Sequence, residues 1–158
     1  MSASPDSPRA VVAATQRALL DGDVAAFARC FAEDAVVEFP FSVEPAVPPR
    51  VEGRESIQKV AAALGERFRR DGRRLRRFEN LIVHETTDPE VLVVEFEALG
   101  DGEAHANGDS GAFRLPDIQV WRVRDGRVQS MRDYLGPEPR AKPPGSGAIR
   151  SFSGSAWG

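Results

Sequence analysis

The Asp125-Gly126 pair is the feature that most constrains the fold of this chain. It stands between WRVR and RVQSM, two segments that alternate apolar and polar residues. A two-residue Asp-Gly connection between such segments is typical of a tight β-hairpin. The two segments are therefore predicted to be neighbouring antiparallel strands.

Further strands are predicted around this hairpin. Residues 75–84, 91–99, 113–124 and 127–135 have the composition of four successive strands that can form an antiparallel meander. Asp88-Pro89 marks one turn, and the polar stretch from Gly100 to Gly111 forms a longer hairpin loop. An earlier strand is predicted at 35–39, and the proline-rich residues 40–53 are predicted to be a loop.

Three helices are predicted in the first half of the chain. Ser7 and Pro8 have the types expected at a helix start, and apolar residues recur at helical spacing until Asp21-Gly22-Asp23. Asp23 caps a second, short helix with Phe27, Cys30 and Phe31 on one side, and residues 54–70 form a third. The order helix, helix, strand, helix and four strands favours an α+β fold with the helices on one face of a curved sheet.

Composition limits the class of protein. The chain has 158 residues, of which 41% are hydrophobic, which suits one domain with a real core. It has no run of about 18 apolar residues, as a membrane span needs, and the start MSASPDSPRA lacks the pattern of a signal peptide. The single cysteine, Cys30, excludes an internal disulfide, and the net charge of −3 disfavours nucleic acid as a partner. We therefore expect a cytoplasmic domain at residues 8–136, a disordered tail at 1–7, and a Pro/Gly/Ser-rich tail at 137–158 whose Phe152 and Trp157 could form a lid.

Three stretches resemble a known family: GDVAAFARCFAEDAVVEFP, EGRESI and VWRVRDGRVQSMRDYLGP. They resemble the SnoaL-like proteins of the nuclear-transport-factor-two-like superfamily, which includes ketosteroid isomerase, limonene epoxide hydrolase and polyketide cyclases. HETTDPEVLVVEFEALG followed by RDYLGP is most similar to the phenazine-biosynthesis A/B type. The resemblance covers residues 8–139 and implies a cone-shaped, curved mixed or antiparallel sheet wrapped by three N-terminal helices, a cystatin-like α+β barrel. It also implies a homodimer.

One catalytic residue of the family has a counterpart in this chain, whereas other catalytic positions hold different residues. Phe39 stands where ketosteroid isomerase has its catalytic aspartate, and Tyr134, the single tyrosine, is not on the first helix. Asp133 matches the last-strand acid of limonene epoxide hydrolase and of the phenazine type. Glu95 and Glu97 stand where the epoxide hydrolase has its Arg-x-Asp partner.

The alternation of side chains along a strand groups the candidate residues by face. The resemblance places three polar-bearing faces inside the cone: Gln129, Met131, Asp133 and Leu135; Leu115, Asp117, Gln119 and Trp121; and Val91, Val93, Glu95, Glu97 and Leu99. The strand at 91–99 also has an opposite, apolar face. This face is expected to be exposed and to pair two subunits, and it consists of Leu92, Val94, Phe96 and Ala98.

Asp133 is the first candidate for a general acid or base, because Met131 and Trp121 would desolvate it and raise its pKa. Asp117 and Glu97 are predicted to lie close enough to share a proton. Trp121, Glu95, Gln119, Met131, Phe39 and Leu115 are predicted to line a substrate pocket. The structural alternatives are that Asp133 holds a loop or pairs with an arginine, that Asp117 caps a turn, and that Glu95 and Glu97 lie on a solvated face.

No cofactor or metal is expected. His84 and His105 lack further ligands at suitable spacing, and no glycine-rich phosphate loop or nucleophile motif is present. The segment RFRRDGRRLRR, residues 67–77, could attract an anionic substrate, an acyl-carrier partner or nucleic acid, or could be a solvated helix end.

The sequence thus favours an enzyme that carries out cofactor-free acid/base chemistry on a small hydrophobic metabolite. The expected reaction is an isomerisation, cyclisation or dehydration in natural-product biosynthesis, with Asp133 as the main proton carrier. A non-catalytic small-molecule-binding or scaffold protein is the alternative, and an epoxide hydrolase is a third possibility.

Overall fold

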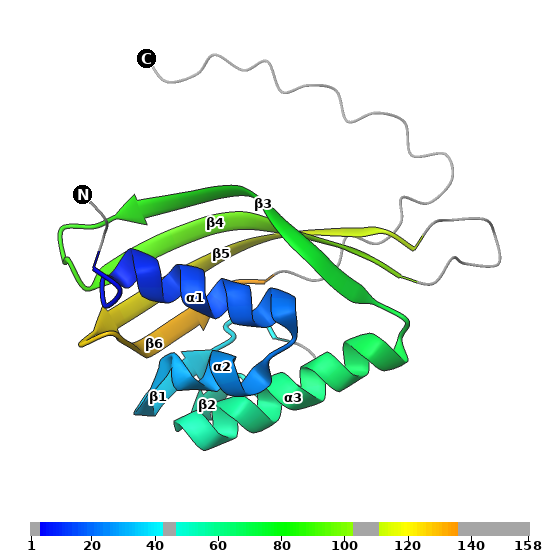
Figure 1. Ribbon diagram of the computed structural model, residues 1–158, viewed down its shortest axis with the longest axis horizontal. Helices are drawn as coiled ribbons and strands as arrows, with labels where there is room; N and C mark the ends of the chain where they lie inside the picture. The colour runs from blue at the N-terminus through cyan, green and yellow to red at the C-terminus, as the bar shows by residue number, and fades with distance from the viewer. Residues whose placement is uncertain (1–3, 43–46, 103–110, 136–158) are drawn as a thin grey trace, which may run out of the picture.

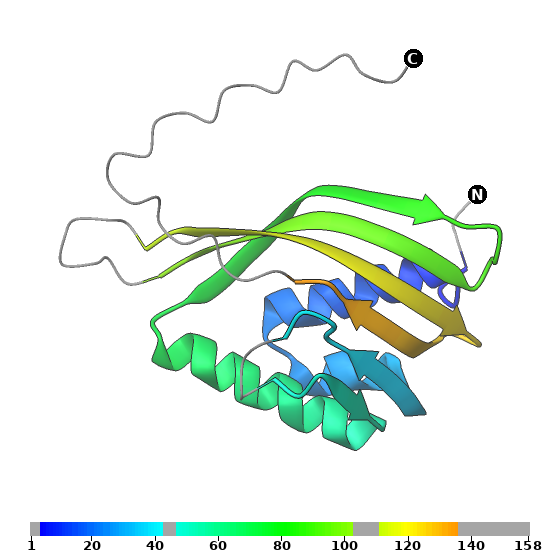
Figure 2. The ribbon, with the colours of Figure 1, turned by 180° about the vertical axis from the view of Figure 1, so that it is seen from behind.

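The computed structural model describes residues 4–42, 47–102 and 111–135. Its helices are α1 (Pro8–Asp21), α2 (Val24–Arg29) and α3 (Arg54–Arg70). Its strands are β1 (Phe31–Glu38), β2 (Arg50–Glu52), β3 (Arg74–Glu85), β4 (Val91–Asp101), β5 (Phe113–Arg124) and β6 (Arg127–Asp133). Figures 1 and 2 show the helices together on one side of a strongly curved sheet. The α+β class and the curved sheet covered by helices are confirmed.

The sheet is mixed. Its strand order is β2-β1-β6-β5-β4-β3, so β3 to β6 form the expected antiparallel meander. β1 pairs with β6 in parallel and with β2 in antiparallel orientation. The side of the sheet that faces the helices is called the inner face below, and the opposite side the outer face.

Local sequence signals begin the first two helices at the predicted residues. The Ser7 hydroxyl accepts a hydrogen bond from the Ala10 N–H at 3.3 Å, and Gly22 ends α1 in the left-handed conformation with φ 68°. The Asp23 carboxylate accepts from the Ala26 N–H at 2.8 Å and caps α2. These contacts pair backbone groups that the helices themselves leave free.

The β5–β6 hairpin contains the predicted turn and one irregularity that the sequence did not show. Asp125 (φ 51°) and Gly126 (φ 68°) form the two-residue turn, with Arg124 opposite Arg127. Val123 then lies opposite Val128, but Arg122 lies opposite Ser130, so β6 holds one extra residue in a β-bulge.

Two predictions about the first half of the sheet are wrong. Phe31 does not belong to the second helix but begins β1, where it is completely buried and lies 6.5 Å, between ring centroids, from Trp121. The residues predicted as a loop at 40–53 contain the short strand β2, whose Val51 lies opposite Val37. Both corrections reflect burial of apolar side chains in the core, which local composition does not reveal.

The faces of β4 are the reverse of those predicted. Leu92, Val94 and Phe96 lie in the core on the inner face, while Glu95 and Glu97 lie on the outer face. Burying three large apolar side chains contributes about 5–9 kcal/mol, whereas burying two carboxylates without cationic partners is unfavourable. The apolar face of β4 is therefore not available to pair subunits.

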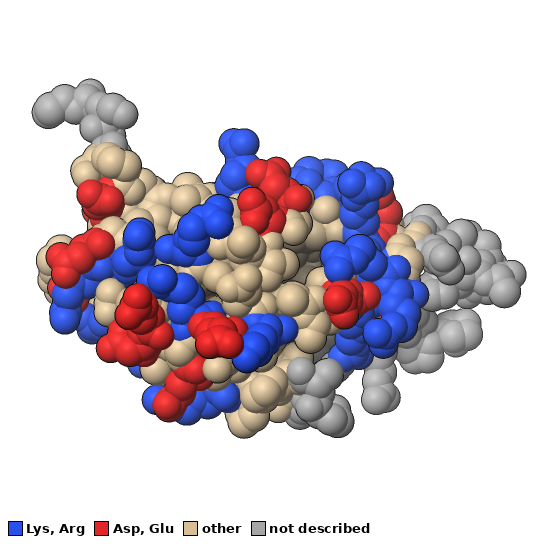
Figure 3. Space-filling model, turned by 60° about the horizontal axis from the view of Figure 1, so that its bottom comes forward, with Lys and Arg blue, Asp and Glu red and all other residues tan. Residues whose placement is uncertain are grey.

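α3 covers the sheet incompletely. Ile57 near its start is buried, but Val60, Leu64 and Phe68, the later members of the same apolar stripe, are only half-buried. Basic side chains gather beyond this half-exposed stripe, at the end of the molecule where α3 leads into β3 (Figure 3).

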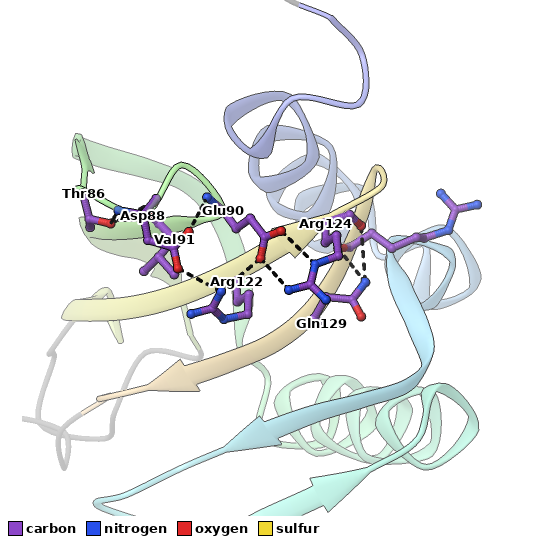
Figure 4. Close-up of polar contacts among 8 residues, drawn as sticks. Thr86, Asp88, Glu90, Val91, Arg122, Arg124 and Gln129 are labelled. Atoms are coloured by element: carbon purple, nitrogen blue, oxygen red, sulfur yellow. Dashed lines mark hydrogen bonds and ion pairs between the residues drawn. The ribbon is translucent and has the colours of Figure 1, made fainter.

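At the opposite end of the sheet, charged side chains form ion pairs between neighbouring segments (Figure 4). Glu90, in the turn just before β4, accepts hydrogen bonds from Arg122 and Arg124 of β5 at 2.8–3.0 Å, and Arg122 also donates to Asp88 at 3.0 Å. Because these groups are partly exposed, the pairs contribute little stability individually. They do connect the β3–β4 turn to the β5–β6 hairpin.

None of the three helices in the described part of the chain is long and apolar enough to cross a lipid bilayer. Residue 105 and the tail from 137 onward, with Phe152 and Trp157, lie outside the described residues. Ser4 to Ser7, within the predicted N-terminal tail, form a turn in which the Ser7 N–H donates to the Ser4 carbonyl at 3.0 Å.

Candidate active site

The inner faces of β5 and β6 carry most of the residues predicted to form the site. β5 contributes Leu115, Asp117, Gln119 and Trp121, all of them buried. β6 contributes buried Met131 opposite Trp121, and half-buried Asp133 opposite Gln119. The bulge in β6 is responsible for this alignment, because without the extra residue Asp133 would point to the outer face.

The Gln119 amide connects two carboxyl groups. Its Nε2 donates to Asp133 Oδ2 at 2.9 Å and to Asp117 Oδ2 at 3.0 Å. Asp133 Oδ1 also accepts from the Leu135 N–H at 2.9 Å. Asp117 Oδ1, in contrast, is buried and has no hydrogen-bond partner in the described structure. Of the four carboxylate oxygens of Asp117 and Asp133, Asp117 Oδ1 is thus the one that accepts no hydrogen bond in the described structure.

Both carboxyl groups hold their protons more tightly than an exposed aspartate does. Burial, and next the nearby negative charge of Asp133, raise the pKa of Asp117 from its ordinary 3.8 to about 7. Burial also raises the pKa of Asp133, although hydrogen bonds from Leu135, Gln119 and Asp117 act in the opposite direction. Asp133 has the better hydrogen bonds for its charged form, which favours Asp117 as the protonated member of the pair.

This arrangement brings two buried carboxyl groups, both with raised pKa values, onto one amide. Two neighbouring carboxyl groups that share one proton near neutral pH can donate a proton with one member and accept one with the other. The sequence pointed to both aspartates but paired Asp117 with Glu97, and it did not identify Gln119 as the residue between them.

Other inner-face residues supply an apolar surround with two further polar atoms. Phe39 is half-buried against the core, as are Val60 and Ala61 of α3. Trp121 Nε1 on β5 and Gln16 Nε2 on α1 are buried N–H donors without a partner in the described residues. The sequence did not single out Gln16; a glutamine among the apolar positions of α1 was the available signal.

Glu95 and Glu97 are not part of this inner-face group, and no hydrogen bond joins Glu97 to Asp117 in the described structure, although both residues line one cavity. Glu95 Oε1 lies 2.6 Å from His84 Nε2, and Glu97 accepts hydrogen bonds from Asn80 and Arg114, all on the outer face. The alternation of β4 explains this, since Phe96 lies opposite Asp117 and its neighbours point the other way. Within residues 4–42, 47–102 and 111–135, no group of three or more His, Cys, Asp or Glu could hold a metal ion.

The comparison with known families matches this fold. The family model of the SnoaL-like domain matches residues 12–131, which is most of the chain. The chain belongs to the SnoaL-like domain family. An uncharacterized PhzA/B-like protein of Pseudomonas aeruginosa is 33% identical to this SnoaL-like chain over 121 residues, which are 77% of this chain and 78% of the relative.

Solved structures show the same fold at lower identity. A Bacillus subtilis protein provisionally described as an isomerase superposes with a TM-score of 0.68 at 24% identity, covering 80% of this SnoaL-like chain and 84% of its own. SalBIII, described as an epoxide hydrolase/cyclase-like enzyme in pyran ring formation in salinomycin, superposes with a TM-score of 0.60 at 19% identity, covering 82% and 90%. These likenesses establish the architecture, and the chemistry must be argued from the residues of this chain.

Proposed function

We propose that this protein is a cofactor-free acid/base enzyme that isomerises, cyclises or dehydrates a small, mainly apolar metabolite of a natural-product pathway. The observation that carries the proposal is the Asp117–Gln119–Asp133 group, two carboxyl groups held on one amide with the pKa of Asp117 near 7. Enzymes that move protons at neutral pH need groups with pKa values in this range.

The proposed reaction needs two proton transfers, one from the carboxyl pair and one back to it. Asp117 gives its proton to a substrate atom that becomes more basic during the reaction, and the pair is then doubly charged. A proton leaving another substrate atom returns to the pair and restores its starting state. Asp133 remains one of the two proton carriers, and Gln119 keeps both carboxylates in place with its two N–H groups.

The surround of the pair favours an apolar substrate. Leu115, Met131 and Trp121 lie on the same inner face, and Phe39 packs against the same core. A substrate that replaces water here would keep the carboxyl groups desolvated, which maintains their raised pKa values.

A titration tests the proposal. Carbon-detected NMR of the aspartate side chains should show one carboxyl group titrating near pH 7 in the wild-type protein and no such group in Asp117→Asn. In Asp133→Asn, Asp117 should titrate at lower pH than in the wild type, because the neighbouring charge is gone, but still above the ordinary 3.8, because burial is the larger cause. Asp34→Asn, a change at an exposed position of β1, is the matched control and should leave the titration near pH 7 unchanged. If every aspartate of the wild type titrates below about pH 5, acid/base catalysis by this pair is refuted.

Ligand binding without catalysis is the second candidate. The free donors Trp121 Nε1 and Gln16 Nε2 favour it, since buried N–H groups usually have an acceptor. A pair that titrates normally, together with saturable binding of a metabolite, would support this function instead. Epoxide hydration is less well supported, because no described Lys or Arg forms an ion pair with Asp117 or Asp133 that could help activate an epoxide oxygen.

A further inference from the structure

The turn between α3 and β3 concentrates positive charge. Five arginines, Arg67, Arg69, Arg70, Arg73 and Arg74, stand within eight residues that contain one acid, Asp71. We call these five residues the arginine turn. Arg76 and Arg77, which follow it, are paired with Asp101 and Glu79.

Part of the charge of the arginine turn is not paired with carboxylates of the described residues. Arg67 Nε lies 3.9 Å from Asp71 Oδ2. Arg69, Arg70 and Arg74 are exposed, and no carboxylate in the described parts of the chain pairs with them. Cations at a helix C-terminus do stabilise the helix dipole. Arg74, however, is already in β3, so the dipole does not account for the whole group.

The arginine turn adjoins half-buried apolar side chains. The Arg73 guanidinium carbon lies 5.0 Å from the ring centroid of Phe68 on α3 and 4.4 Å from that of Phe113 on β5. The two rings are 5.9 Å apart and nearly perpendicular. Phe68, Phe113 and the neighbouring Leu64 are all half-buried, so cationic and apolar groups are accessible side by side.

β5 runs from this surface to the carboxyl pair. Phe113, Leu115 and Asp117 follow one another on the inner face of β5, so Phe113 and Asp117 are separated by about 13 Å along the strand. An elongated organic molecule that lies along Phe113 would therefore extend toward Asp117.

We propose that the arginine turn binds the carboxylate or phosphate of a small amphipathic organic anion, whose apolar body lies along Phe68 and Phe113 toward Asp117. The inference rests on the proposed function in that it names the class of substrate for the same site. The anionic group supplies affinity and orientation, and the neutral end meets the acid/base pair.

Two dyes test this proposal. 8-Anilinonaphthalene-1-sulfonate and N-phenyl-1-naphthylamine have the same aromatic body, but only the first carries an anionic group. Fluorescence titrations of the full chain should show tighter binding of the sulfonate, and salt at about 0.5 M should remove most of the difference.

Paired variants locate the charge. Arg69→Gln/Arg74→Gln should weaken binding of the sulfonate about tenfold and leave binding of the neutral dye within about twofold. Arg17→Gln/Arg29→Gln removes two exposed arginines of α1 and α2 and makes the same change in net charge, so it should leave both affinities unchanged. Thermal melting of both double variants checks that they are folded.

Three results would overturn the proposal: equal binding of the two dyes by the wild type, equal effects of the two double variants, or no binding of either dye. Asp117→Asn separates this inference from the proposed function. It should abolish the titration near pH 7 but retain the preference for the sulfonate, so failure of the carboxyl pair and failure of the arginine turn give different results.

Discussion

Replacing Asp117 by asparagine should stabilise the protein at alkaline pH and have little effect at acidic pH. Asparagine keeps the shape of the side chain and can still accept the hydrogen bond from Gln119, but it removes a charge that burial makes unfavourable. The folded pKa of about 7 lies above the ordinary 3.8, so the folded state binds the proton more tightly than the unfolded chain does. The contribution of Asp117 is therefore complete below about pH 4, and it falls as the pH rises until Asp117 is ionised in the folded state.

The magnitude follows from the difference between the two pKa values. A difference of about 3 at about 1.4 kcal/mol for each pH unit gives about 4 kcal/mol, as an upper value, between pH 4 and pH 8. For a chain of this size the corresponding rise in Tm is about 8–16 °C.

Urea denaturation at a series of pH values measures the effect. The free energy of unfolding of Asp117→Asn minus that of the wild type should grow from near zero at pH 4 to its full value at pH 8. Asp34→Asn, at an exposed site, should show no such growth. A difference that does not change with pH, or that decreases as the pH rises, would refute the account of Asp117 as a buried carboxyl group with a raised pKa.

Three other predictions concern Gln119, Gly100 and the outer face of the sheet. Gln119→Leu removes a hydrogen bond that lowers the pKa of both aspartates, so NMR titration should place both pKa values higher than in the wild type; unchanged values would contradict the bridging role. Gly100→Ala puts a Cβ 2.2 Å from the Arg74 carbonyl and the Phe113 ring, so urea denaturation should show a loss of stability of about 1–3 kcal/mol. The control Gly65→Ala lies within α3 and has its nearest neighbour at 3.6 Å. It should be neutral or stabilising by up to about 1 kcal/mol. The predicted homodimer has the outer face available to it, so light scattering should find a dimer that Ile118→Glu, at a position 46% exposed there, converts to a monomer; a monomeric wild type would disprove the dimer.

The sequence was most informative where a structure depends on a few neighbouring residues. Asp125-Gly126 determined a hairpin, Ser7 and Asp23 determined two helix starts, and the stripe of residues 54–70 gave α3 with the bounds that the structure shows. Positive φ angles, caps and helical stripes are local properties, so they can be seen before the fold is known.

The inner and outer faces of β4 could not be obtained in this way. Alternation shows that Glu95 and Glu97 share one face and Leu92, Val94 and Phe96 the other, but it does not say which face meets the helices. The resemblance led to the wrong choice, whereas the energetic preference for burying the apolar set gives the right one.

The sequence by itself determined the class of fold, the strand partners in the hairpin and the two aspartates worth testing. Only the tertiary structure decided that these aspartates meet at Gln119. Counting back from the turn with regular pairing puts Arg132 opposite Gln119, and the one-residue bulge beyond Val128 puts Asp133 there instead. A bulge depends on the fit of a strand to its neighbours and to the core, and so does the desolvation that raises the two pKa values. Both are properties of the packed sheet, which is why the chemistry of the site emerged only with the fold.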